Sequence, residues 1–226
     1  MQFQVISASI SFIRSNIIYL SQFSLKEELM DNISNNNQYF EVTFSKQVIP
    51  SVADCEFEEC EFNDCDFSDA IFKHCKFLNC SFNRCNLSLM KVPLTRFFEV
   101  DFNDCKMVGV DWTKADWPSF HRDSQLSFNR CILNDCSFFG LVLNELKLIE
   151  CKIHDVDFRN GDFANSTMTF CDFTNSIFMK TNLQNVDFSD SSDFTIDVMQ
   201  NRIAQAKFSR FEALSLLESL DIELVD

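Results

Sequence analysis

Glycine and proline are scarce in this sequence, whose 226 residues include only three of each. A fold with many short strands normally places these residues at its turns, so this chain must turn by another, regularly repeated device. The shortage of glycine also excludes a glycine-rich phosphate-binding loop. Histidine is equally rare, and His74, His121 and His154 are too scattered to propose a Ser-His-Asp set. We therefore assign no catalytic residue and expect neither enzymatic activity nor a cofactor.

Long apolar runs are absent as well. The stretch 3–20 is fairly apolar, but Arg14 and several Ser and Asn residues interrupt it, which makes it too polar for a membrane span. It also lacks the basic start and the small-residue cleavage site of a secretory signal. These absences predict a cytoplasmic protein that does not bind membranes and keeps its thiols reduced. Met30-Asp31 offers an alternative start, which would leave residues 1–29 outside the mature chain.

Basic residues are in the minority. The chain has 19 Lys and Arg against 34 Asp and Glu, a formal net charge of −15. Such a chain repels nucleic acid and anionic membranes, so direct nucleic-acid binding is excluded. A charged partner should instead be basic, and a protein surface that normally binds DNA is one candidate.

What the sequence does contain is a period of five, built from its 27 Phe and 11 Cys. Two series of 13 positions at five-residue steps, from Phe57 to Trp117 and from Phe128 to Phe188, are apolar without exception. The positions two residues earlier are mostly small. A helix would spread this pattern around its whole surface, and a straight strand would send successive centres to opposite faces. The pattern fits a chain that turns a corner after every five residues, with two residues of each five inside.

Runs such as Cys55-Glu56-Phe57 and Cys171-Asp172-Phe173 carry a family resemblance. They resemble the pentapeptide-repeat family, whose consensus is Ala-(Asp/Asn)-Leu-X-X. The resemblance covers residues 54–193 and implies an all-β fold, a right-handed quadrilateral β-helix with four pentapeptides in each coil. Twenty residues per coil give about seven coils, or roughly 34 Å of rod at the spacing of neighbouring strands.

All eleven cysteines occupy the small inward positions. None forms a Cys-x-x-Cys pair, so we interpret them as core packing and expect no metal site. A coil of twenty residues stacks Cys55 on Cys75, Cys60 on Cys80, and Cys65 on Cys85 and Cys105.

One break divides the repeats into blocks 54–117 and 128–193. Trp117 and Phe128 are eleven residues apart, one more than two repeats, so residues 118–127 should hold a one-residue bulge or short loop. Two interpretations remain open. The segment is a corner that absorbs an insertion, or it is a projecting loop that touches a partner, in which case Phe120, His121 and Arg122 are the possible contacts.

Both ends should close the solenoid, because an exposed sheet edge and core would aggregate. We expect the segment 1–53 to be partly flexible or to cap the first coil, with Tyr39-Phe40 and Phe44 packing over it. In the segment 194–226, Ser209 and Glu212 have the spacing of a capping box before a short helix, and 222–225 reads as a short strand. The tail resembles the C-terminal end of Qnr-type quinolone-resistance proteins, which implies a homodimer. The cap and dimer residues would be Phe208, Phe211, Leu214, Leu217, Leu220, Ile222 and Leu224.

Acidic residues are concentrated at the start of the repeats. Residues 54–69 contain eight acidic and no basic residues, and 54–193 contains 24 acidic and 13 basic residues, a difference of −11. Judged by charge alone, one interpretation is that these acidic residues have no role beyond keeping a Phe-rich rod soluble. The resemblance to Qnr-type and MfpA-type proteins implies a duplex-DNA mimic that binds DNA gyrase or topoisomerase IV and protects it from quinolone-like inhibitors. The alternative is a scaffold or adaptor for an unrelated protein. The candidate partner-binding residues are Glu56, Glu58, Glu59, Glu61, Asp64, Asp66 and Asp69.

Overall fold

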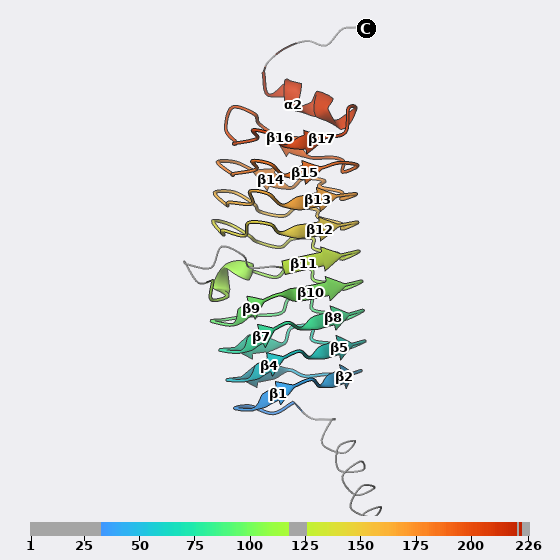
Figure 1. Cartoon of the computed structure of the whole chain (residues 1–226), viewed down its shortest axis with the longest axis vertical. Helices are drawn as coiled ribbons and strands as arrows, with labels where there is room; N and C mark the ends of the chain where they lie inside the picture. Colours follow the sequence, from blue (N-terminus) through green and yellow to red (C-terminus); the bar gives the residue numbers. More distant parts are fainter. Residues whose placement is uncertain (1–32, 118–125, 221, 223–226) are drawn as a thin grey trace, which may run out of the picture. The chain divides into compact units, whose positions relative to one another are not determined.

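The computed structural model describes residues 33–117, 126–220 and 222, and Ser34–Asp226 form one compact unit. This unit is a stack of flat coils (Figure 1). Its helical turns are η1 (Trp112–Lys114), η2 (Glu212–Leu214) and α2 (Ser215–Glu218). Its strands are β1 (Gln38–Phe40), β2 (Thr43–Ser45), β3 (Ser51–Ala53), β4 (Glu56–Glu58), β5 (Glu61–Asn63), β6 (Ile71–Lys73), β7 (Lys76–Leu78), β8 (Ser81–Asn83), β9 (Arg96–Phe98), β10 (Val100–Asn103), β11 (Leu126–Asn129), β12 (Lys147–Ile149), β13 (Thr167–Thr169), β14 (Ile177–Phe178), β15 (Asp187–Phe188), β16 (Thr195–Ile196) and β17 (Lys207–Phe208).

Four faces run along the stack, and the strand pairs on them are parallel. The first face carries β1-β4-β7-β9, and the second carries the nine-stranded sheet from β2 to β17. The third face is held by isolated bridges such as Asp66 to Asn86, and the fourth by β3-β6, further bridges and β14-β16. Paired residues are normally twenty apart in sequence, as in the register of Phe57 with Phe77. The corners predicted from the period of five and the four-sided, all-β solenoid implied by the family resemblance are confirmed, with about eight coils.

The core is a column of stacked rings. Phe57 stacks on Phe77 with ring centroids 4.9 Å apart, and Phe62 stacks on Phe82 at 4.5 Å. Rings on neighbouring faces meet edge to face, as Phe62 and Phe77 do at 71°. Both geometries are the ones that aromatic quadrupoles favour. Burying each large centre stabilises the coil by about 1.5–3 kcal/mol.

The corners explain how the chain turns with so little glycine. In the described residues, 28 non-glycine residues adopt a positive φ, and 14 of them are Asn or Asp. The left-handed conformation costs most residues about 1–2 kcal/mol, and Asn and Asp tolerate it best. Most corner residues also donate their backbone N–H to the next coil, as Asp64 does to the carbonyl of Asn83 at 2.9 Å. The hydrogen bonds between coils therefore offset the conformational free-energy cost of these turns.

The solenoid extends beyond the expected limits of 54 and 193. Residues 34–53 supply β1, β2 and β3, so they add a coil, and Phe44 lies in its core. At the other end, β16 and β17 continue the stack. Both added coils contain a step of 18 residues in place of 20, seen in the registers of Tyr39 with Phe57 and of Ile177 with Thr195. These two-residue shortenings hide the coils from a count by fives.

The break between the two blocks is larger than one residue. Phe102 pairs with Phe128, 26 residues later, so six residues beyond a normal coil are inserted between Trp117 and Leu126. The spacing of eleven from Trp117 to Phe128 is one repeat plus six residues, not two repeats plus one. The expectation of a one-residue bulge was wrong, because Trp117 and Phe128 lie on adjacent faces. Residues 118–125 lie outside the described residues.

The C-terminal end is covered by η2 and α2, but without the expected capping box. The residue at the N-cap of η2 is Phe211, and it makes no side-chain capping hydrogen bond. The hydroxyl of Ser209 instead accepts the backbone N–H of Asp190 at 2.8 Å, because Ser209 lies one coil above that residue. The predicted strand at 222–225 falls almost wholly outside the described residues. No helix in the described part of the chain is both long and apolar enough to cross a membrane.

Candidate partner-binding surfaces

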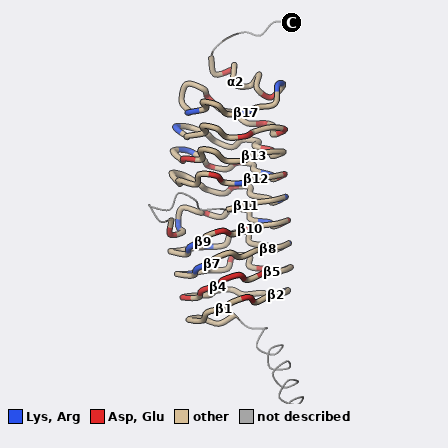
Figure 2. The backbone as a smooth tube through the Cα atoms, in the orientation of Figure 1, with Lys and Arg blue, Asp and Glu red and all other residues tan. Residues whose placement is uncertain are grey.

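The acidic coil, residues 54–69, carries an open ring of outward carboxylates over three of the four faces. Glu56 and Glu58 flank the buried Phe57 on β4, and Glu61 leads β5 on the next face. Asp66 follows on the third face, and the remaining carboxylates stand at corners, where φ is positive: Asp54, Glu59, Asp64 and Asp69. The alternation of inward and outward side chains thus places every predicted acidic residue outside. Figure 2 shows the acidic positions around β4 and β5, with basic ones beside β7 and β9.

Basic residues of the following coil neutralise part of this ring. Arg84 donates two hydrogen bonds to Asp64, at 2.7 and 2.9 Å. The ammonium group of Lys76 lies 3.6 Å from Glu56, and the ring of His74 lies 3.5 Å from Asp54. Each of these basic residues lies twenty residues after its acidic partner, outside the segment 54–69 whose charge was counted. The sequence therefore predicted more uncompensated negative charge in this segment than the structure contains.

The other acidic residues of the coil make no ion pair within the part of the chain that the structure describes: Glu58, Glu59, Glu61, Asp66 and Asp69. Asp66 is fixed by the Ser68 hydroxyl and N–H and by the Asn86 amide, and these hydrogen bonds hold the pKa of Asp66 below its usual range. Its carboxylate therefore stays charged under any physiological condition.

The structure adds one residue that sequence reasoning missed. Glu41 occupies the corner one coil before Glu59, and its N–H donates to the carbonyl of Glu58 at 3.0 Å. The corner positions that stack on Glu59 in the next two coils are occupied by Asn79 and Glu99. Glu41 escaped notice because residues 34–53 were expected to cap the coil, whereas they extend the acidic surface by another coil.

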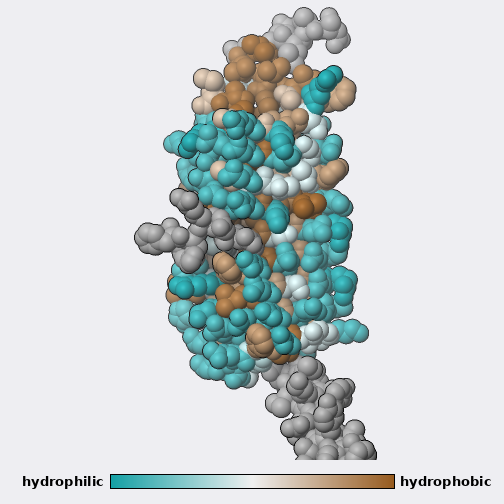
Figure 3. All heavy atoms as spheres, in the orientation of Figure 1, coloured by the Kyte–Doolittle hydropathy of each residue, from teal (hydrophilic) through white to brown (hydrophobic). Residues whose placement is uncertain are grey.

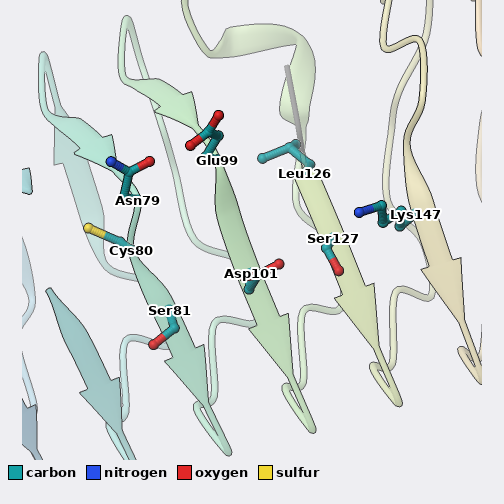
Figure 4. Close-up of a pocket in the computed structure, with 8 residues that line it drawn as sticks. All are labelled: Asn79, Cys80, Ser81, Glu99, Asp101, Leu126, Ser127 and Lys147. Atoms are coloured by element: carbon teal, nitrogen blue, oxygen red, sulfur yellow. The ribbon is translucent and has the colours of Figure 1, made fainter. Parts of the chain in front are cut away.

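Next to the insertion, the second face is hollowed into an open polar groove of about 430 Å³. Glu99 and Asp101 line it from one coil, Ser127 and Lys147 from the next two, as Figure 4 shows. Among the described residues, its lining combines two carboxylates with the ammonium group of Lys147, so it is a polar surface of mixed charge. The candidate loop contacts Phe120, His121 and Arg122 lie outside the described residues.

The cysteines form columns inside the coil, as their spacing predicted. The third-face column is longer than expected, because the insertion brings Cys131, Cys151 and Cys171 into line with Cys65, Cys85 and Cys105. All eleven are buried and free. Burial raises the pKa of Cys75 to about 11 and of Cys136 to about 12, which leaves these thiols protonated and unreactive. Among the described residues, no group of three or more His, Cys, Asp or Glu side chains could hold a metal ion.

The C-terminal cap exposes apolar side chains at the end of the rod. Phe208 packs inward and stacks on Phe188 with ring centroids 5.1 Å apart, and Leu217 is half-buried. Phe211 is 82% exposed, and Leu214, Leu220 and Ile222 are also exposed. Leu224 lies outside the described residues. Figure 3 shows apolar surface gathered over the end that carries α2.

Three solved structures share this architecture. A trypsin-treated variant of QnrB1, described as a plasmid-mediated fluoroquinolone resistance protein, matches 85% of this chain and 99% of its own with a TM-score of 0.65 and 16% identity. Full-length QnrB1 matches 84% of this chain and all of its own with a TM-score of 0.50 and 17% identity. HetL from the cyanobacterium Nostoc sp. strain PCC 7120, described as involved in heterocyst differentiation regulation, matches 83% of this chain and 90% of its own, with a TM-score of 0.57 and 10% identity.

At these identities the likeness concerns the fold alone. No curated protein sequence matches this chain significantly. The family model described as the pentapeptide repeat region, however, matches residues 55–122 and 123–188, which is more than half of the chain. Together with the buried centre at every fifth residue, this match establishes that the chain belongs to the pentapeptide-repeat family.

Proposed function

We propose that this protein is a non-enzymatic, cytoplasmic DNA mimic whose acidic coil occupies a basic DNA-binding surface of a type II topoisomerase, DNA gyrase or topoisomerase IV. The observation that carries the proposal is the row of outward carboxylates, five of which form no ion pair among the described residues, on a rod whose fold matches nearly the whole length of QnrB1. Binding would alter the activity of the enzyme or protect it from quinolone-like inhibitors. No cofactor takes part, and no nucleic acid is bound directly.

Charge density and rigidity support this mimicry. The net charge of −11 over residues 54–193, spread over seven coils at about 4.8 Å, is one charge per ~3 Å of rod, and duplex DNA carries one per ~1.7 Å. The ladder of backbone hydrogen bonds fixes the main-chain positions of the acidic residues before any partner arrives. A preformed rod therefore loses little conformational entropy when it enters a basic groove.

Homodimerisation through the C-terminal cap is the second part of the proposal. Phe211, Leu214 and Leu220 expose apolar surface at the end of the rod, where two copies could meet tail to tail. In such a dimer the acidic coils would lie at both far tips, each able to contact a basic surface.

The decisive experiment is DNA supercoiling by purified gyrase with and without this protein, in the absence and presence of ciprofloxacin. We expect the protein to inhibit supercoiling or to restore it in the presence of the drug, with a dependence on protein concentration. Unchanged supercoiling and unchanged drug inhibition up to tens of micromolar protein would eliminate the topoisomerase target.

The alternative is a pentapeptide-repeat scaffold or adaptor that binds an unrelated protein. The likeness to HetL, a solenoid described by its role in regulating heterocyst differentiation, favours this class. Salt discriminates the two: a contact dominated by the acidic coil weakens steeply as ionic strength rises, whereas an apolar adaptor contact does not.

A further inference from the structure

The coil after the acidic coil, and the first half of the next one, have the opposite character. From Ala70 to Phe98 there is no acidic residue, although the chain contains 34 of them. The same stretch has five basic residues: Lys73, Lys76, Arg84, Lys91 and Arg96. A rod that needed only uniform solubility would not concentrate its charges of opposite sign in consecutive coils.

Two leucines stand out on this segment. Leu89 and Leu94 occupy the two corners that bracket the fourth face of one coil, with φ of +58° and +56°. Their side chains are 50% and 57% exposed. A leucine gains nothing from water and fits the left-handed conformation poorly, whereas Asn or Asp fills half of the positive-φ positions. Leu89 packs over Gly109 of the following coil, which gives it a structural contact, but folding alone does not account for Leu94.

Two lysines complete the surface between these corners. Lys73 follows the exposed Ile71 and the buried Phe72 on β6, and Lys91 bridges to Ile71 from the next coil. Both lysines are exposed, and neither forms an ion pair with any residue that the structure describes. The three other bases of the stretch are each engaged, Lys76 with Glu56, Arg84 with Asp64 and Arg96 with Asp116. We call Ile71, Lys73, Leu89, Lys91 and Leu94 the leucine–lysine patch.

We propose that the leucine–lysine patch binds a polypeptide segment that carries both acidic and apolar side chains. Its carboxylates would pair with Lys73 and Lys91, and its apolar groups would cover Leu89 and Leu94. The site is separate from the acidic coil and does not depend on the proposed topoisomerase target. A nucleic acid or an anionic membrane fits less well, because the patch has only two unpaired cations, Asp69 occupies the corner one coil before Leu89, and the whole chain is strongly acidic.

The test is a selection of random dodecapeptides displayed on phage against the full-length protein. A parallel selection uses the double variant Lys91→Glu/Leu94→Asn. We expect the wild type to enrich peptides with Asp or Glu beside Leu, Ile or Phe, and the double variant to lose at least about tenfold of that enrichment, which is the factor expected for one lost ionic or apolar anchor. A variant at a comparable exposed corner, Phe170→Asn, should leave the enrichment unchanged.

Folding is checked separately. Asn suits a positive φ better than Leu, so Leu94→Asn should unfold at the same or a higher temperature than the wild type. A lower unfolding temperature would show that Leu94 has a structural role and would overturn the proposal. So would the absence of enriched peptides, or enrichment of basic peptides. Binding of a duplex oligonucleotide or of phosphatidylserine vesicles that is lost in Lys91→Glu but kept in Leu94→Asn would assign the patch to polyanions instead.

Discussion

Phe102 stacks on Phe128 with ring centroids 5.0 Å apart and ring planes at 8°, although 26 residues separate them. Phe82 and Phe102, which are twenty residues apart, stack with the same 5.0 Å spacing. The six inserted residues therefore leave the aromatic column undisturbed, and the chain resumes its register at Leu126. An insertion at this corner can vary without consequence for the core.

The first prediction follows from this register. Deletion of residues 119–124 removes the six additional residues and restores a coil of twenty. Because shortening a loop changes the free energy of unfolding by about 0.6 kcal/mol per halving, the melting temperature followed by circular dichroism should move by only a few degrees. Loss of cooperative unfolding would show that the segment is part of the fold. If Phe120, His121 and Arg122 contact a partner, the same deletion abolishes the effect on gyrase while the fold persists.

The second prediction concerns the core. Phe77 is fully buried and stacks on both Phe57 and Phe97. Phe77→Asp places an unpaired carboxylate in this column, which costs several kcal/mol out of a typical total stability of about 5–15 kcal/mol. We expect the variant to lose its β-sheet circular dichroism. The matched control is Asn79→Asp, an exposed corner two residues away, and a folded Phe77→Asp protein would contradict the stacked core.

The third prediction is a loss of stability in acid. The hydrogen bonds from Arg84 hold the pKa of Asp64 below its usual range, and Arg130 does the same for Asp104. Since the folded pKa lies below the unfolded value of about 3.9, this stabilisation is complete above that pH and disappears as the pH falls through the folded pKa. Urea denaturation should therefore show a smaller decrease from about pH 5 to pH 2 for Asp64→Asn/Asp104→Asn than for the wild type. An identical decrease in both proteins would show that these pairs contribute nothing.

The fourth prediction tests the acidic coil. Replacing Glu56, Glu58, Glu59 and Glu61 by Lys reverses the outward charge of two faces without touching a buried residue. We expect the quadruple variant to keep its fold and to leave the supercoiling activity of gyrase and its inhibition by ciprofloxacin unchanged. Raising the salt from about 50 to 300 mM should weaken the wild-type complex by a factor of ten or more, because exposed charges are screened over about a Debye length. A quadruple variant with wild-type effect would locate the contact elsewhere.

The fifth prediction concerns assembly. Phe211→Asp/Leu214→Asp puts two charges on the exposed cap, so sedimentation at micromolar concentration should show a monomer where the wild type sediments as a dimer. A charge at Met199, another exposed apolar residue near this end, serves as the control. A wild-type monomer at that concentration would remove the dimer from the proposed function.

The fold could be predicted from the sequence because every centre obeys one rule of spacing. Counting by fives turned these centres inward, and the coil of twenty residues implied by the family resemblance places Phe57, Phe77 and Phe97 in one column, where the structure stacks them. Counting failed where the step changes. A spacing of eleven between Trp117 and Phe128 is compatible with two different paths, and the shortened step that includes Pro50 removed the first coil from the pattern.

The charges of the candidate surface were harder to predict. The outward position of the acidic residues followed from the repeat, but their pairing depends on contacts between coils. Lys76 could have been assigned to Glu56 by adding twenty residues, and its ion pair is present. The failure of the capping box has the same origin, since the Ser209 hydroxyl bonds to Asp190 in the coil below and not to its own helix.

In the described part of the rod, strands pair with the coil above and the coil below, and the register is normally twenty residues. Distances along the axis therefore change in steps of one coil, about 4.8 Å each. Duplicating one set of twenty residues would move the acidic coil away from the C-terminal cap by one coil spacing, and excising one set would move it closer by the same amount. The chemistry of every face would stay as it was. The separation between two contact points can thus evolve independently of the contacts themselves.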